Sequence, residues 1–222
     1  MKKWMLIIVI MGAAIIFSPE VQAVSLHFST QVGSTSWTVA KAGSDFEMTF
    51  DNIVVDWSDP ASANLIGDEV IIPKMTLSVV SDNGTDMIIA SLTPSDDKLY
   101  IRDDSGLGDV MVATLGPDVM LNIWKDLMAY TVQKGDLSSV STPHPGYSAV
   151  IDGLIAAQAD GLDIDFAFTG DSVSPLYSLL HGSSLTPVIG VMNGSIEAIP
   201  EPATIMLLGI GIALCRKFRK GR

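Results

Sequence analysis

The chain has 222 residues, 48% of them hydrophobic and 17% charged, with a formal net charge of −12 at pH 7. Its single cysteine, Cys215, lies near the C-terminus, which excludes disulfides and thiol chemistry from the rest of the chain. An acidic excess of this size repels phosphate backbones and anionic headgroups, so we expect no nucleic-acid binding and no membrane binding by the central domain itself.

The N-terminal segment has the three-part layout of a secretory signal peptide. Lys2 and Lys3 precede an apolar run from Trp4 to Phe17, and compact side chains follow at the −3 and −1 positions of a cleavage site. The run is shorter than the roughly 20 apolar residues of a spanning helix. We therefore predict a signal peptide over residues 1–23, cleaved between Ala23 and Val24.

The C-terminal segment contains a proline-rich triplet, Pro200-Glu201-Pro202, followed by an apolar stretch from Ala203 to Cys215. As a helix this stretch would be roughly 20 Å long, against a hydrocarbon core of about 30 Å, which favours temporary anchorage. The two prolines keep the segment before the helix extended. The basic residues that follow the helix are Arg216, Lys217, Arg219 and Lys220.

This basic cluster predicts the orientation of the terminal helix, because positive charge stays on the cytoplasmic side. Lys2 and Lys3 are retained on the same side during export. Both ends therefore predict a protein tethered in the inner membrane with residues 24–199 facing the periplasm.

The tail from Pro200 to Arg222 resembles the PEP-CTERM sorting domain. The resemblance is carried by Pro200-Glu201-Pro202-Ala203-Thr204, by a short helix with Gly209 and Gly211, and by the terminal basic cluster. It implies recognition of Pro200, Glu201 and Pro202 by a membrane-embedded exosortase. The basic cluster would be the stop-transfer signal. It also implies cleavage at or near the motif and transfer to the surface of a Gram-negative bacterium that makes exopolysaccharide.

The domain between the two ends, residues 24–199, holds 23 of the 25 acidic residues and only six of the 13 basic ones. Alternating apolar residues bounded by Gly, Asp, Asn and Ser predict antiparallel strands. We expect a mainly β domain, an antiparallel sandwich or jelly roll with one or two packed helices. The alternating runs are Leu26–Phe28, Phe46–Phe50, Met75–Val79, Leu99–Ile101 and Leu162–Phe168.

Four further segments carry local signals. Asn193-Gly194 predicts a type I′ hairpin turn between two strands, 188–192 and 195–199. Apolar residues at helical spacing favour amphipathic helices over 120–131 and 147–157. Strands are the alternative for both segments. Ser138 to Gly146, which contains two prolines, is expected to be a long loop.

The sequence gives little sign of catalysis. His27, His144 and His181 are scattered, and the motifs of zinc proteases, serine hydrolases and phosphate-binding loops are absent. Paired carboxylates also permit a polysaccharide hydrolase, but such sites use buried Glu, and only five of the 25 acids are Glu. We therefore expect that the protein is not an enzyme and binds no cofactor.

Clustered aspartates offer an alternative, because calcium is bound by several carboxylate and carbonyl oxygens. Asp163 and Asp165 alternate with apolar residues, which is more typical of the solvent face of a strand. None of the clusters has the spacing of an EF-hand loop. They are Asp96-Asp97, Asp103-Asp104 with Asp109, and Asp160 to Asp165.

From these features we expect an exported cell-surface or biofilm-matrix protein with a non-catalytic structural or adhesive role. Its expected partners are an exosortase, the secretion machinery and an exopolysaccharide. A carbohydrate- or calcium-binding module is the alternative, and a polysaccharide hydrolase is the third interpretation.

Overall fold

The computed structural model describes residues 24–116, 119–133, 135–159, 161–171 and 175–198. All of them belong to one compact unit, Val24–Ile199. The predicted signal peptide, the predicted terminal transmembrane helix and the basic cluster lie outside the described residues.

The described residues form a mainly β fold in which every strand pairing is antiparallel, as predicted. The five alternating runs all lie in strands, and their apolar side chains point to the interior except Val79, which is 42% exposed. The strands are β1 (Ser25–Thr30), β2 (Trp37–Ala42), β3 (Asp45–Phe50), β4 (Ile53–Asp59), β5 (Glu69–Ile71), β6 (Met75–Asp82), β7 (Met87–Pro94), β8 (Lys98–Asp103), β9 (Gly108–Leu115), β10 (Val119–Trp124), β11 (Ala129–Gln133), β12 (Gly135–Ser141), β13 (Leu162–Gly170) and β14 (Val188–Ala198).

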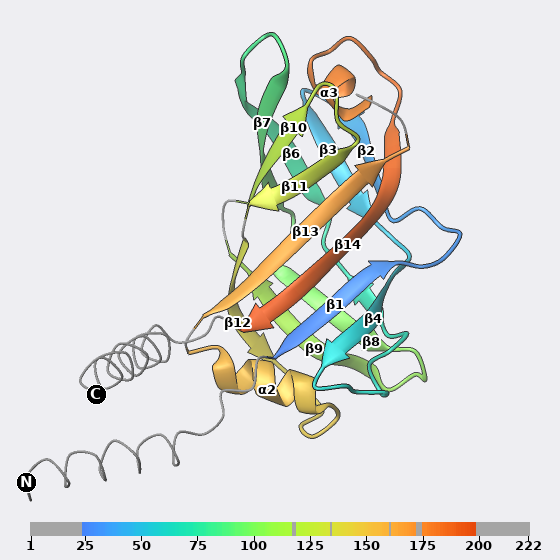
Figure 1. Cartoon of the computed structure of the whole chain (residues 1–222), viewed down its shortest axis with the longest axis vertical. Coiled ribbons are helices and arrows are strands. Elements are labelled where there is room, and N and C mark those ends of the chain that lie inside the picture. Colours follow the sequence, from blue (N-terminus) through green and yellow to red (C-terminus); the bar gives the residue numbers. More distant parts are fainter. Residues whose placement is uncertain (1–23, 117–118, 134, 160, 172–174, 199–222) are drawn as a thin grey trace, which may run out of the picture. The chain divides into compact units, whose positions relative to one another are not determined.

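The sheet closes on itself in the order β1-β14-β2-β3-β6-β7-β10-β11-β13-β12-β9-β8-β5-β4. An additional pairing joins β13 to β14 across this circuit and divides it into two rings. One ring continues from the pair through β2, β3, β6, β7, β10 and β11, and the other through β1, β4, β5, β8, β9 and β12. The long β13–β14 pair is shared by both rings and lies along the front of the sheet in Figure 1.

A row of aromatic side chains fills the interior beneath β13. Phe166 and Phe168 stack with ring centroids 6.0 Å apart. Phe28 of β1 contacts Phe166 at one end, and Trp37 of β2 contacts Phe168 and Tyr130 at the other. All five side chains are at most 2% exposed, so the two rings share one continuous core.

The predicted hairpin turn at Asn193-Gly194 is wrong, because β14 runs through it without interruption. Gly194 lies where the Phe28 ring and the carbonyl oxygen of Asp165 approach the backbone, and a Cβ there would lie 2.5 Å from Phe28 Cε2 and 2.6 Å from that oxygen. A glycine inside a strand often marks such a close approach. β14 also pairs on both sides, so it is not an edge strand.

The predicted helix over 120–131 is also wrong, because the segment folds into β10 and β11. The buried residues alternate, with Leu121 and Ile123 fully buried. Trp124, Leu127 and Met128, which a helix would have turned inward, are 42–49% exposed. Period-2 burial in the closed sheet outweighs the helical spacing here.

The second predicted helix is confirmed as α2 (Ala149–Ala157), which buries Val150, Ile151 and Leu154. Ser148 caps its N-terminus by accepting a hydrogen bond from the backbone N–H of Val150. A second helix, α3 (Pro175–Leu180), was not predicted. Figure 1 shows α2 at the end of the sheet near β12 and β1, and α3 at the opposite end.

The expected loop over 138–146 is partly wrong, because β12 extends to Ser141 and pairs with β9 and β13. The remaining loop leads from β12 into α2. Neither α2 nor α3, the helices of the described ranges, has the length and hydropathy of a membrane span.

Candidate functional site

The residues predicted to direct signal cleavage and sorting flank the folded unit in the sequence. Ala23 and Ile199 lie outside the described residues, as do Pro200, Glu201, Pro202, Arg216, Lys217, Arg219 and Lys220. Val24, on the other side of the predicted signal cleavage, is described and only 8% exposed.

Val24 is held by the fold at the point where the chain leaves β14. Its carbonyl oxygen accepts a hydrogen bond from the backbone N–H of Ala198 at 3.0 Å. Its side chain lies against α2 at Gly153, where an added Cβ would come within 2.9 Å of Val24 Cγ2. The first and last described residues of the domain, Val24 and Ala198, are therefore neighbours.

Three carboxylates meet at one end of the sheet, close to α2. Asp68 precedes β5, Asp103 ends β8, and Asp104 follows it. One oxygen from each lies within 4.8 Å of the others. Asp68 is 1% exposed and Asp103 is 8% exposed, so two of the three carboxylates are buried.

The hydroxyl of Tyr147 lies at the centre of this cluster. It is 2.7 Å from Asp103 Oδ1, 3.1 Å from Asp68 Oδ2 and 2.7 Å from the carbonyl oxygen of Asn64. A tyrosine hydroxyl has one proton, and it cannot donate to three acceptors at once. A second proton, carried by one of the carboxyls, would let that carboxyl donate to the tyrosine oxygen.

The surroundings of the two buried carboxyls shift their pKa values in opposite directions. Burial raises the pKa of Asp68 to about 6, an effect that the N–H of Asp104 and the hydroxyl of Tyr147 only partly offset. The hydroxyl of Ser105 and the backbone N–H of Leu107 lower the pKa of Asp103 to about 2. Burial and the two carboxylates raise the pKa of Tyr147. Asp68 is therefore the carboxyl that takes up a proton as the pH falls below about 6, whereas Asp103 stays ionised there.

The same oxygens are hard ligands of the kind that Ca²⁺ or Mg²⁺ takes, but with one oxygen from each residue the cluster supplies three of the six to eight oxygens of a calcium site. Asp103 and Asp104 belong to one of the aspartate groups singled out from the sequence. Asp68 and Tyr147 were missed, because they are distant in the chain and no spacing connects them. Only the closure of the sheet brings them together.

The other aspartate groups lie elsewhere. Asp96 accepts a hydrogen bond from the N–H of Lys98 in the turn before β8, and Asp109 pairs with Arg102 at 2.9 Å. Asp163 and Asp165 lie on the outward-facing side of β13, as the alternation predicted. Asp160 is outside the described residues.

The three histidines are not brought together into one site. His27 packs edge-on against Trp57, and His144 is half-buried in the loop before α2. His181 follows α3, where its Nδ1 lies 2.7 Å from Asp82 Oδ2 and its ring stacks on Tyr177.

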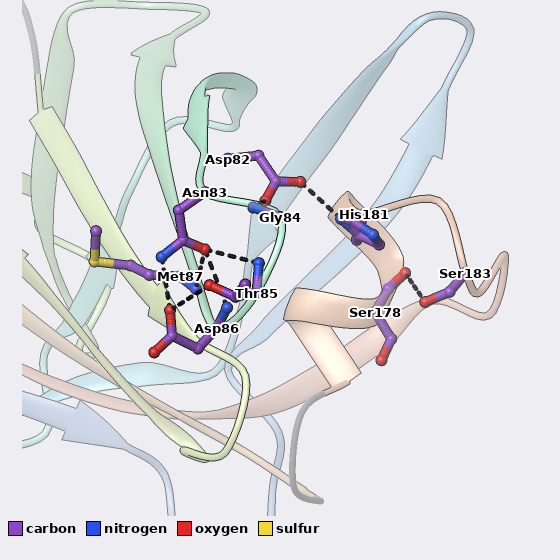
Figure 2. A network of polar contacts seen from close by, with 9 residues as sticks. All are labelled: Asp82, Asn83, Gly84, Thr85, Asp86, Met87, Ser178, His181 and Ser183. Carbon is purple, nitrogen blue, oxygen red and sulfur yellow. Dashed lines mark hydrogen bonds and ion pairs between the residues drawn. The ribbon is translucent and has the colours of Figure 1, made fainter.

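Figure 2 shows the network around the His181–Asp82 contact, at the tip of the β6–β7 hairpin. Asn83 Oδ1 accepts hydrogen bonds from the backbone N–H groups of residues 85–87 at 3.0–3.1 Å. Asp82 Oδ1 accepts from the N–H of Gly84, which together with His181 lowers the pKa of Asp82. The network closes the hairpin tip and ties it to the end of α3.

The outer face of the β13–β14 pair is hollowed. One hollow of about 480 Å³ is bordered by residues of β1, β4, β13 and β14. A second, of about 350 Å³, lies under the loop between β1 and β2, and both are lined by Ala167 and Asn193. We call the two together the β13–β14 groove.

Strand register places polar side chains in a row across the groove. Ser195 of β14 is paired with His27 of β1 on one side and with Asp165 of β13 on the other. A β-bulge in β4 opposite His27 and Phe28 inserts Asp56 as an extra residue. The bulge turns both Asp56 and its neighbour Trp57 outward, and Trp57 is 49% exposed.

The comparisons with known proteins match the tail of the chain. A family model described as the PEP-CTERM protein-sorting motif matches residues 198–222, which confirms the resemblance seen in the sequence. No curated protein and no solved structure matches the chain.

Proposed function

We propose that this chain, a PEP-CTERM protein by the sorting motif at its C-terminus, is a non-catalytic structural or adhesive protein of the cell surface or biofilm matrix. The motif implies an exported protein processed by an exosortase. In the proposed sequence of events the chain is first tethered in the inner membrane, facing the periplasm. It is then released to the surface.

The observation that carries the proposal is the position of the motif relative to the fold. The match begins at residue 198, and Ala198 is the last residue of β14. Cleavage just after this residue, together with signal cleavage before Val24, leaves the strands and the core intact. The released domain would need no refolding.

The closed sheet supports a role outside the cell. Each strand has a hydrogen-bonded neighbour on both sides, so the described strands offer no free edge for pairing with other chains. The excess of acidic over basic residues in this domain also favours solubility and keeps copies apart. Both properties suit a domain that accumulates at high local concentration in a matrix.

Replacement of Pro200, Glu201 and Pro202 by alanine tests the sorting step. We expect the variant to keep its C-terminal tail and to remain in the inner-membrane fraction. Pro143 and Pro145 also flank one residue, within the loop before α2, and their replacement by alanine is the matched control. The proposal is wrong if the triple variant has the size and location of the wild-type protein.

A second candidate function is the binding of a divalent cation at Asp68, Asp103 and Asp104, favoured by oxygens within 4.8 Å of one another. Calcium added to chelator-treated protein at pH 7 should raise the unfolding temperature, because a ligand bound only by the folded state stabilises it. Asp104→Asn should reduce the rise, whereas Asp109→Asn should not. No rise in the wild-type protein would exclude this candidate.

A further inference from the structure

The β13–β14 groove is longer than the pocket of a single small ligand. Asp165, Ala167 and Thr169 alternate along its floor on β13, a span of about 13 Å at ~3.3 Å per residue. Ala167, in the middle, is the smallest of the three and keeps the floor low. The groove therefore suits an extended ligand that lies along β13.

The lining of the groove mixes apolar and polar groups and carries little charge. Among the described residues that line the two hollows, the charged side chains are Asp56 and Asp165. The neutral hydrogen-bonding groups include the amides of Asn193 and Gln31 and several Ser and Thr hydroxyls, among them Ser195. Carboxylates accept hydrogen bonds, whereas amides and hydroxyls both donate and accept them. The lining therefore complements a ligand rich in hydroxyl groups.

An exposed aromatic side chain stands beside these polar groups. Trp57 contacts His27, a lining residue, with ring centroids 4.7 Å apart and planes at 85°. This edge-on contact fixes the indole while leaving about half of the side chain exposed. The bulge at Asp56 holds the indole and a carboxylate next to each other on the same face.

We propose that the β13–β14 groove binds a neutral glycan chain, with the indole of Trp57 against the apolar face of a sugar ring and Asp56, Asp165 and Asn193 bonded to its hydroxyls. The inference rests on the proposed adhesive role and gives that role a ligand. Charge-assisted hydrogen bonds from sugar hydroxyls to the two carboxylates supply orientation. An anionic glycan would be repelled by the same carboxylates and by the acidic domain around them.

A cationic peptide is the competing occupant, because it would also be attracted to Asp56 and Asp165. The strands of the groove floor disfavour it: β13 and β14 are paired on both sides, so they offer no backbone groups for an added strand. The two occupants differ in their response to salt. Attraction to exposed carboxylates is screened, whereas stacking and hydrogen bonding to a neutral sugar are much less so.

The test uses the full-length protein in detergent on an array of neutral and uronate-containing oligosaccharides, with an oligolysine peptide as a third probe. We expect retention of neutral oligosaccharides that persists in high salt. Trp57→Ala should weaken it about tenfold or more, as loss of an aromatic anchor does. Trp124→Ala, which removes an indole of similar exposure from β10, should leave it unchanged.

Asp165→Asn provides a second variant that leaves the aromatic contact in place. It should weaken binding of neutral oligosaccharides without changing the unfolding temperature. The inference is overturned if no neutral oligosaccharide is retained, if Trp57→Ala and Trp124→Ala behave alike, or if only oligolysine binds and is released by salt. Export and C-terminal trimming of Trp57→Ala should match wild type, so failure of the groove and failure of the sorting proposal give different results.

Discussion

The hydroxyl of Tyr147 lies 2.7 Å from Oδ1 of Asp103, and this contact ties the loop before α2 to the end of β8. The same hydroxyl reaches Asp68 before β5. One side chain thus connects three segments at the end of the sheet that α2 covers.

Tyr147→Phe removes the donor shared by the two buried carboxyls. Because a buried acceptor that loses its partner keeps its desolvation cost, we expect a loss of about 1–2 kcal/mol in the free energy of unfolding at pH 7. Urea titration followed by tryptophan fluorescence measures it. Tyr100→Phe, on β8 outside the cluster, is the control. Equal losses of stability in the two variants would contradict the hydrogen bonds of Tyr147 to the buried carboxyls.

Asp68→Asn tests the proton held in the cluster. The pKa of Asp68 is raised from 3.8 to about 6 in the folded protein. Between these values the folded state keeps a proton that the unfolded chain has released, so this group's contribution to stability falls as the pH rises from about 4 to about 6. Asparagine keeps an N–H donor at every pH, so the variant should lose this part of the pH dependence.

The measurement is the unfolding temperature of wild type and Asp68→Asn from pH 4 to pH 7. The unfolding temperature of the variant should rise relative to that of the wild type as the pH rises. Asp103, with its pKa lowered to about 2, has the opposite sign, because its contribution is lost only as the pH falls from about 3.8 toward 2. A constant difference between wild type and variant across pH 4–7 would show that Asp68 titrates normally.

Gly194→Ala tests the close contact inside β14. The new Cβ would lie 2.6 Å from the Asp165 carbonyl oxygen, a backbone atom that cannot move aside. We expect a loss of about 1–3 kcal/mol or more, as for other overpacked sites. Ser195→Ala, the adjacent position of the same strand, should cost less, and a Gly194→Ala variant as stable as wild type would contradict the register.

Asn83→Ala tests the hairpin network of Figure 2. Its amide oxygen is the acceptor for three backbone N–H groups, so its removal should open the tip locally. Hydrogen exchange at residues 85–87 should become faster, while β13 and β14 stay protected. Ser183→Ala, which removes one hydrogen bond to Ser178 near α3, should not accelerate exchange at the tip.

Alternation predicted the strands well wherever one face is buried, as in β13, because every second side chain there enters the aromatic core. It failed for β10 and β11, because Trp124 at the end of β10 and Leu127 in the connection to β11 are exposed and imitate the spacing of a helix. The α2 helix was predicted correctly because its buried residues Val150, Ile151 and Leu154 recur at helical spacing.

The candidate sites were much less accessible from the sequence. Asn193-Gly194 has the composition of a turn, yet Gly194 is required by the Phe28 ring, a contact across strands that no local pattern encodes. The groove likewise joins Asp56 and Asp165 only through the pairing of β4, β1, β14 and β13. The sorting motif could be recognised because its signal is local and contiguous.

The intact mass of the protein recovered from the surface fraction of producing cells is the most direct test of the proposed processing. We predict a chain that begins at Val24 and ends close to the sorting motif, without the basic residues 216–222. A surface protein whose mass still includes those residues would contradict exosortase processing, and with it the proposed release of the folded domain.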